Sequence, residues 1–233
     1  MSRVHQLRFG VLMLMLSFLP SPLLAQENDP TAKRSRAANA TAESSILVLQ
    51  PDRVFDARGE QAQPEWWVVI RGETIAAVGP AKSIEIPPKA RVLPLPGCTV
   101  LPGLIDAHTH VLLHPYDEAK WDDQVLREPH ALRICRAVNH LRSDLLSGFT
   151  TLRDLGTEGV GFADIGLRDA VEQGIVPGPR LLVATKAIVA TGSYAPRAGF
   201  APEVELPQGA DEADLDSIPR VVRSQIRAGA DLT

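Results

Sequence analysis

The strongest constraint on the fold is an alternation of strand-like and helix-like segments that begins after Pro102-Gly103. Residues 128–147 carry apolar side chains at three- and four-residue spacing, which predicts a helix. The further helices are expected at 162–174 and 213–228, and the strands at 103–111, 149–156, 179–185 and, at the end, 230–232. Strands that alternate with helices at this spacing predict βαβ units around a parallel sheet.

The number of these units indicates how much of a barrel is present. They occupy residues 103–233, whereas a complete eightfold barrel takes about 250 residues. We therefore expect an α/β fold that is the first half of a (β/α)8 TIM barrel. The sequence stops at a strand with no helix after it, so we also expect a truncated barrel domain.

The region before the barrel, residues 45–102, predicts a small β-domain. Its β-rich runs are separated by turn residues such as Arg71-Gly72-Glu73 and Gly79-Pro80. The runs are 46–49, 66–70, 74–78 and 91–95. So few strands do not bury a core without help from elsewhere in the protein.

The N-terminal residues 1–25 have the pattern of a secretory signal peptide. Arg3 and Arg8 precede the apolar run Phe9–Leu19, and Ala25 is a plausible cleavage position. A membrane anchor is the alternative, but a spanning helix needs about 20 apolar residues. We expect an exported protein, periplasmic or secreted after cleavage, without a stable membrane anchor. Residues 26–44 are small and polar, as in a flexible lead-in.

Charge and cysteine content exclude some functions. The net charge of −4 is mild. Proteins that bind nucleic acid usually carry a concentrated basic face, so no nucleic-acid partner is expected. Export would permit a disulfide between Cys98 and Cys135, but both lie among apolar residues and are expected to be small buried side chains. Two cysteines cannot form a zinc site alone.

The motif Asp106-Ala107-His108-Thr109-His110 lies at the end of the first barrel strand. Alternate residues of a strand project to one side, so Asp106, His108 and His110 share a face. Two imidazoles in this arrangement can bind one metal ion, and the carboxyl ends of barrel strands form the active face. We expect His108 and His110 to be metal ligands. We expect Asp106 to orient one of them through a hydrogen bond, without itself binding the metal.

Several segments resemble one enzyme superfamily. "LPGLIDAHTH" (101–110) is similar to the first barrel strand of the metal-dependent amidohydrolases. "GFTTLRDLG" (148–156) and "GPRLLVATKAIVATGSYAP" (178–196) resemble the second- and third-strand segments of its imidazolonepropionase-like and Xaa-Pro dipeptidase-like branch. The short-stranded region before the barrel, residues 45–102, resembles part of the superfamily's small N-terminal β-sandwich domain, and the whole resemblance covers about residues 46–232.

The resemblance implies hydrolysis of carbon–nitrogen bonds in a small amide or peptide substrate. It implies one or two divalent ions, expected to be zinc, of which His108 and His110 bind the more buried one. The bridging lysine, the later histidines and the general-base aspartate of the family have no counterpart in residues 1–233, so no catalytic base is assigned and the metal site is expected to be incomplete. A lactonase or deaminase of the same superfamily, or a catalytically inactive fragment, are the alternatives.

Three further residues are candidates for contacts with substrate. Tyr194 and Arg197 lie on a Gly- and Pro-rich loop after the third strand, and such loops often carry substrate contacts. His114 follows the metal motif in "VLLHPYDE", where an exposed loop histidine is the simpler interpretation. The pair Arg153-Asp154 is expected to be structural. Substrate, metal identity and number, and oligomeric state stay open, including a homo-oligomer of the full-length protein.

Overall fold

The computed structural model describes residues 45–194, 201, 203–206 and 208–233. The predicted signal peptide and lead-in lie outside the described residues. The described chain forms two compact units, one made of residues 45–54 and 62–99 and the other of residues 55–61 and 100–233.

The first unit is built on a five-stranded sheet with the order β2-β1-β3-β4, in which β5 also pairs with β1. Its strands are β1 (Ile46–Val54), β2 (Gln63–Pro64), β3 (Trp66–Arg71), β4 (Thr74–Pro80) and β5 (Arg91–Val100). The β1–β3 and β3–β4 pairs are antiparallel, and Val48, Val68 and Val69 are buried. The four β-rich runs of the sequence are thus confirmed as strands, whereas β2 is too short to show a pattern.

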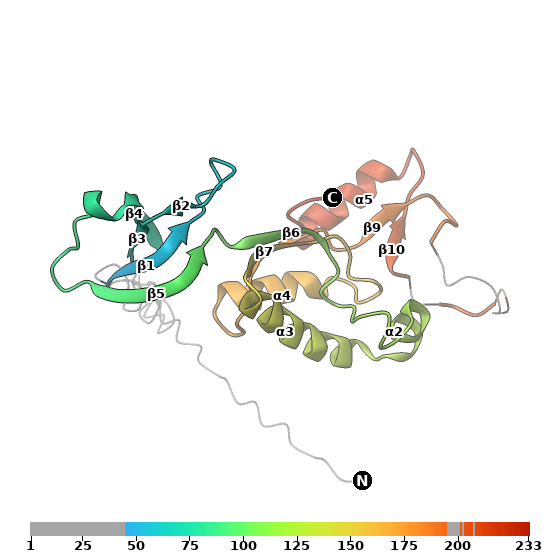
Figure 1. Ribbon diagram of the computed structural model, residues 1–233. Coiled ribbons are helices and arrows are strands. Elements are labelled where there is room, and N and C mark those ends of the chain that lie inside the picture. The colour runs from blue at the N-terminus through green and yellow to red at the C-terminus, as the bar shows by residue number, and fades with distance from the viewer. Residues whose placement is uncertain (1–44, 195–200, 202, 207) are drawn as a thin grey trace, which may run out of the picture. The chain divides into compact units, whose positions relative to one another are not determined.

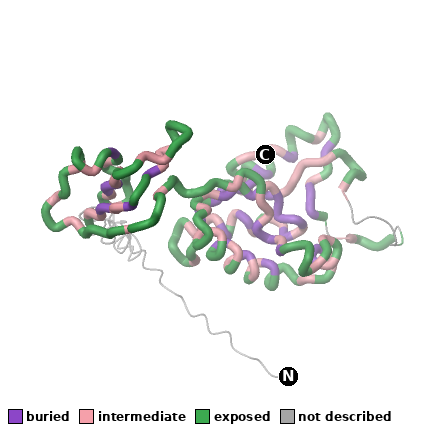
Figure 2. The backbone as a smooth tube through the Cα atoms, viewed as in Figure 1, coloured by how far each residue is buried: buried purple, intermediate pink, exposed green. Residues whose placement is uncertain are grey.

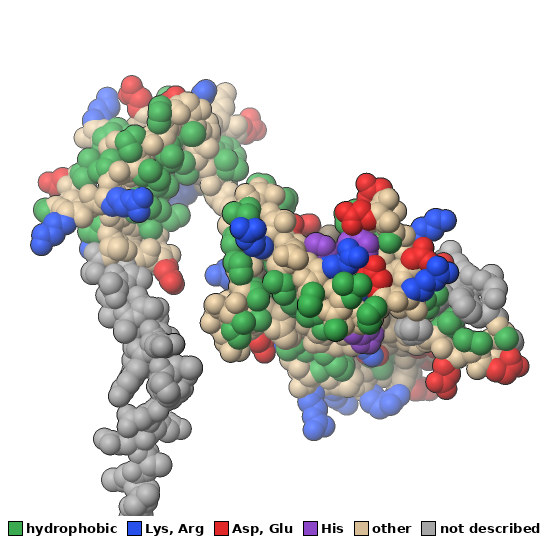
Figure 3. Space-filling view, turned by 90° about the horizontal axis from the view of Figure 1, so that it is seen from below, with side chains coloured by type: hydrophobic (Ala, Val, Ile, Leu, Met, Phe, Trp, Pro, Cys, Tyr) green, Lys and Arg blue, Asp and Glu red, His purple; other side chains and the backbone are tan. Residues whose placement is uncertain are grey.

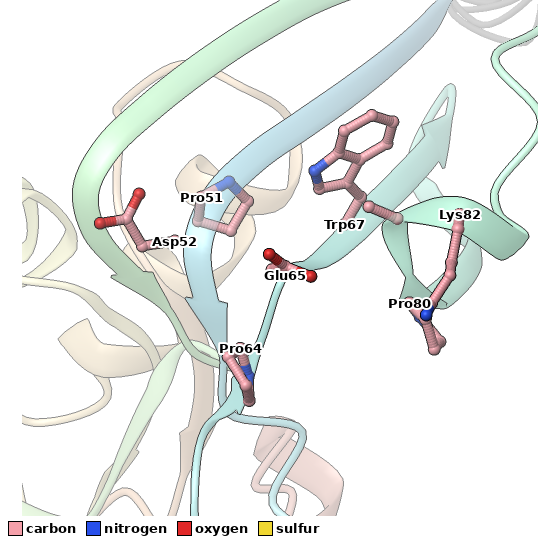
Figure 4. Close-up of a pocket in the computed structure, with 8 residues that line it drawn as sticks. Pro51, Asp52, Pro64, Glu65, Trp67, Pro80 and Lys82 are labelled. Carbon is pink, nitrogen blue, oxygen red and sulfur yellow. The ribbon is translucent and has the colours of Figure 1, made fainter.

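A surface pocket of about 560 Å³ lies in this first unit. Its lining includes three prolines, Trp67, the acidic residues Asp52 and Glu65, and Lys82 (Figure 4). One Asp52 carboxylate oxygen accepts a hydrogen bond of 3.0 Å from the Gly97 amide of β5. Asp52 therefore already supports the sheet, and the histidine motif lies in the other unit.

The second unit contains a parallel sheet in the order β6-β7-β8, with helices joining consecutive strands. The strands are β6 (Leu104–Thr109), β7 (Phe149–Asp154) and β8 (Arg180–Val183), and the helices are α3 (His130–Leu146) and α4 (Ala163–Glu172). Both helices lie on the same side of the sheet (Figure 1). The βαβ prediction is confirmed.

The core of the second unit lies between this sheet and its helices (Figure 2). Its buried residues are Val111, Leu112, Ala137, Leu141, Leu152, Val160, Leu167, Leu181 and Val183. A close approach at the start of β6 requires glycine, because a Cβ on Gly103 would lie 2.1 Å from Thr150 Oγ1.

The buried face of α3 differs from the expected one. The helix buries Arg133, Ala137 and Leu141, whereas Cys135, which the apolar spacing placed on the buried face, is exposed. The face is rotated because Arg133 finds backbone acceptors in the interior and can be buried there. Cys98 is exposed as well, and both thiols are free, so the expectation of two buried cysteines was wrong.

The remaining elements of the second unit were only partly expected. Three elements were not predicted: helix α2 (Trp121–Arg127) and the short parallel pair β9 (Ala187–Val189) and β10 (Ala210–Glu212). Helix α5 (Ile218–Ala228) begins later than predicted and ends at Gly229, whose φ of 113° is left-handed.

The strand expected at residues 230–232 is not formed, but the chain there does reach the edge of β8. The Asp231 amide donates to the Val183 carbonyl at 2.9 Å, and the Asp231 side chain accepts from the Val183 amide at 3.0 Å. None of the helices in the described part of the chain has the length and apolarity needed to cross a membrane.

Candidate metal centre

The two predicted ligands, His108 and His110, lie together at the carboxyl end of β6. His108 is within the strand and His110 is the first residue after it. Their ring centroids are 5.4 Å apart with the rings inclined at 66°. Histidine side chains are visible on the surface of the second unit beside acidic and basic side chains (Figure 3). The alternation of the strand therefore brings both imidazoles to one place.

A hydrogen bond of its ring selects which nitrogen of His110 can bind a metal. His110 Nδ1 lies 3.0 Å from the carbonyl oxygen of Gly156, in the loop after β7. A carbonyl can only accept, so Nδ1 must carry the proton and Nε2 keeps its lone pair. Metal-binding histidines commonly donate their second nitrogen to a carbonyl in this way. The ring of His110 is therefore held with Nε2 free, as a metal ligand would require.

Asp106 acts on the main chain rather than on a ring. One of its carboxylate oxygens accepts a 3.0 Å hydrogen bond from the backbone amide of His108. The His108 ring itself is exposed. In this structure Asp106 thus orders the strand that carries the ligand, while the expected support of a ring comes from Gly156.

The two histidines fit a divalent ion as two of its ligands. Both are nitrogen donors of the type that zinc and similar ions prefer. Among the residues that the structure describes, no group of three or more His, Cys, Asp or Glu side chains is arranged to hold an ion. The described residues thus offer two candidate ligands, His108 and His110.

Glu158, which the sequence analysis did not single out, lies directly behind His110. Glu158 Oε1 is 3.4 Å from His110 Nδ1, and only 11% of the Glu158 side chain is exposed. Its other oxygen accepts hydrogen bonds from Trp121 Nε1, at 2.9 Å, and from the Tyr194 hydroxyl. A glutamate in a Gly-rich loop has no periodic signature, so spacing alone could not identify it.

Arg133 holds the loop that carries Glu158. It is 1% exposed and donates to the carbonyls of Glu158 at 2.7 Å, Leu112 at 3.1 Å and Thr157 at 3.4 Å. Burial lowers the pKa of the Arg133 guanidinium. One side chain of α3 therefore joins the loop after β6 to the loop after β7.

Tyr194, the first of the substrate-contact candidates, contacts protein groups. Its ring packs edge to face on Trp121 with centroids 5.8 Å apart, and burial together with the Glu158 hydrogen bond raises the pKa of its hydroxyl. A Cβ on Gly209 would lie 2.5 Å from the Tyr194 hydroxyl oxygen, so glycine there permits this position. The second candidate, Arg197, lies outside the described residues.

His114 is not the exposed loop residue that the sequence suggested. It is 6% exposed, and its two ring nitrogens lie 3.0 Å from carboxylate oxygens of Glu118 and Glu128. Both nitrogens face carboxylate oxygens, so the structure leaves His114 no free nitrogen for substrate.

Arg153 and Asp154 do not pair with each other, because neighbouring residues of a strand project to opposite faces. Arg153 is exposed and donates to the Ala107 carbonyl at 2.6 Å. Asp154 is fully buried and accepts from the Gly156 amide at 3.1 Å. Burial raises the pKa of Asp154 to about 8, so its carboxyl is mainly protonated at neutral pH.

The chain belongs to an enzyme family of hydrolase type. The model of the Amidohydrolase family matches residues 99–231, which contain both histidines and the parallel sheet. The chain is therefore a member of the amidohydrolase family.

Solved structures agree with this assignment and with the barrel fold. A Xaa-Pro dipeptidase with bound methionine in its active site is 28% identical, with a TM-score of 0.67, over 80% of this chain and 46% of that one. A prolidase complexed with N-methylphosphonate-L-proline is 32% identical, with a TM-score of 0.64, over 80% and 45%. The chain thus spans less than half the length of these structures, and its α/β unit is part of a TIM barrel.

One curated relative is a deaminase rather than a dipeptidase. A 5-methylthioadenosine/S-adenosylhomocysteine deaminase from Syntrophobacter fumaroxidans (strain DSM 10017 / MPOB) is 41% identical over 80 residues, which are 34% of this chain and 17% of that protein. This match covers too little of either protein to choose between the two activities.

Proposed function

We propose that this protein is a metal-dependent hydrolase of carbon–nitrogen bonds in small peptides or amides, with His108 and His110 as ligands of the ion. The observation that carries the proposal is the orientation of His110, whose Nδ1 is bonded to Gly156 so that Nε2 is left for a metal. The similarity to a dipeptidase and a prolidase supports a small peptide as the substrate. Zinc is the proposed metal, since imidazole ligands suit it.

Each described residue of the site has a defined part in this proposal. A divalent ion supplies Lewis-acid polarisation of the scissile carbonyl and activation of water. His108 and His110 hold it, and the Gly156 carbonyl fixes the ring of His110. The Trp121–Tyr194 pair shields the Glu158 carboxylate from solvent. None of the described residues is assigned as a general base.

The test is hydrolysis of Xaa-Pro dipeptides by the protein expressed from its own gene, with Zn²⁺ added and released proline measured. We expect turnover that falls at least about 100-fold when both His108 and His110 are replaced by alanine, since an incomplete ligand set loses the ion. His130→Ala is the matched control, because His130 is exposed on α3. Turnover that survives the double substitution would refute the proposed site.

A deaminase is the second candidate, because one curated relative carries that activity. The same protein would then release ammonia from 5′-methylthioadenosine and no proline from dipeptides. The variant with both His108 and His110 replaced by alanine should lose activity in either assay. Which product the wild-type protein releases, proline or ammonia, therefore separates the two activities.

A further inference from the structure

We propose that Glu158 is a positioning residue for the proposed metal ligand His110: its carboxylate reinforces the tautomer that the Gly156 carbonyl selects, in which Nε2 is free to bind the ion. The inference rests on the function proposed above. It assigns Glu158 no contact with substrate and no part in proton transfer.

One oxygen of the Glu158 carboxylate, Oε2, is held by two hydrogen bonds. Trp121 and Tyr194 both donate to Oε2, and these donors come from α2 and from the loop after β9. An ionised carboxylate accepts such hydrogen bonds more strongly than a neutral group does. Because Oε2 is anchored, Oε1 is left facing His110 Nδ1 at 3.4 Å.

The backbone of Glu158 is fixed independently of its side chain. Its φ of 49° is in the left-handed region, which is unfavourable for a residue with a side chain. Arg133 donates to the Glu158 carbonyl at 2.7 Å and so holds this conformation. The carboxylate is thus directed by contacts that do not involve His110, as a positioning role requires.

Two acceptors meet at the same atom of His110. Nδ1 lies 3.0 Å from the Gly156 carbonyl and 3.4 Å from Glu158 Oε1. A Cβ on residue 156 would lie 3.3 Å from Glu158 Oε1 and 3.5 Å from the His110 ring, so glycine leaves room for both. A negative oxygen beside Nδ1 favours the proton there and makes Nε2 the better donor to a metal.

Glu158→Gln tests this role with little change in shape. The amide oxygen can replace Oε2 and accept from Trp121 and Tyr194, which places the amide NH₂ beside His110 Nδ1. A donor would then face a donor, which opposes the Nδ1–H tautomer that the Gly156 carbonyl still supports, so the Nε2–H tautomer gains population. Removal of such an outer partner typically costs about 10–100-fold in metal affinity.

The measurement is ¹⁵N NMR of the histidine side chains at one fixed pH near 8, without metal, followed by calorimetric titration with Co²⁺. We expect wild-type His110 to be protonated on Nδ1. We expect the variant to populate the Nε2–H tautomer and to bind Co²⁺ about 10-fold more weakly. Glu172→Gln is the control, because Glu172 is exposed on α4.

The outcomes separate this inference from the proposed function. If Glu158→Gln leaves the tautomer and the Co²⁺ affinity at wild-type values, the positioning role is refuted, while the metal site stands as long as the double histidine variant loses Co²⁺. If that double variant still binds Co²⁺, the site itself is refuted. Should Glu158→Gln fail to fold, Glu158→Ala replaces it, since it also removes the negative oxygen beside His110 Nδ1 and must shift the tautomer in the same direction.

Discussion

Arg133→Leu is expected to destabilise the second unit by about 3 kcal/mol or more. The guanidinium donates to three backbone carbonyls, those of Leu112, Thr157 and Glu158. Leucine fills part of the volume but donates no hydrogen bond, so buried carbonyls lose their partners. A buried ion pair can be replaced by apolar residues at little cost when both partners are removed. Here the acceptors are main-chain carbonyls, which remain buried in the variant without a donor.

The free energy of unfolding in urea at pH 7 measures this effect. Arg142→Leu is the control, because Arg142 lies on the same helix and is exposed. Arg133→Lys should recover part of the loss, since an ammonium can still donate to these carbonyls but lacks the planar fork of arginine. Equal stability of the Arg133→Leu and Arg142→Leu variants would show that the three hydrogen bonds do not hold the two loops together.

Asp154→Asn is expected to stabilise the protein at pH 8 relative to wild type, with a gain that disappears near pH 4. Burial raises the pKa of Asp154 from 3.8 to about 8. Between these values the unfolded chain releases the proton while the folded chain keeps it, so wild-type stability falls as pH rises. The loss is on the order of 5 kcal/mol over the whole range, and asparagine lacks the titrating proton.

Urea unfolding of both proteins at pH 4, 6 and 8 gives the difference in stability as a function of pH. The change of this difference with pH is the test, rather than its value at one pH. One Asp154 oxygen is buried without a hydrogen-bond partner, so an amide in its place changes the free energy of unfolding by an amount that does not depend on pH. A difference that does not change with pH would mean that Asp154 is not the group whose protonation is coupled to folding.

The sequence was sufficient for the βαβ units because their signals are local. A turn at Pro102-Gly103 and apolar spacing in residues 128–147 are each set by a few neighbouring residues, and β6 and α3 lie where they were expected. The short strands β9 and β10 depend on each other across a long loop, so no local pattern could show them. The predicted signal peptide in residues 1–25 stays a prediction.

The alternation of side chains along a strand predicted the two histidines of the site but not the residues around them. It brings His108 and His110 together, but the groups that orient the His110 ring, Gly156 and Glu158, come from the loop after β7. The burial of Arg133 has no signal in hydrophobic periodicity, because it depends on three interior carbonyls that accept from the guanidinium. The expectation that His114 is an exposed loop residue was wrong, because carboxylate oxygens of Glu118 and Glu128 face its ring nitrogens and allow its burial.

The central claim is that His108 and His110 bind one divalent ion through imidazole nitrogen. X-ray absorption at the zinc edge, on protein loaded with Zn²⁺ and washed free of excess metal, measures this directly. We expect imidazole nitrogen at about 2.0–2.1 Å from zinc, with the zinc content and this signal lost in the double alanine variant and kept in His130→Ala. Zinc bound with the same spectrum after both histidines are replaced would show that these two side chains are not its ligands.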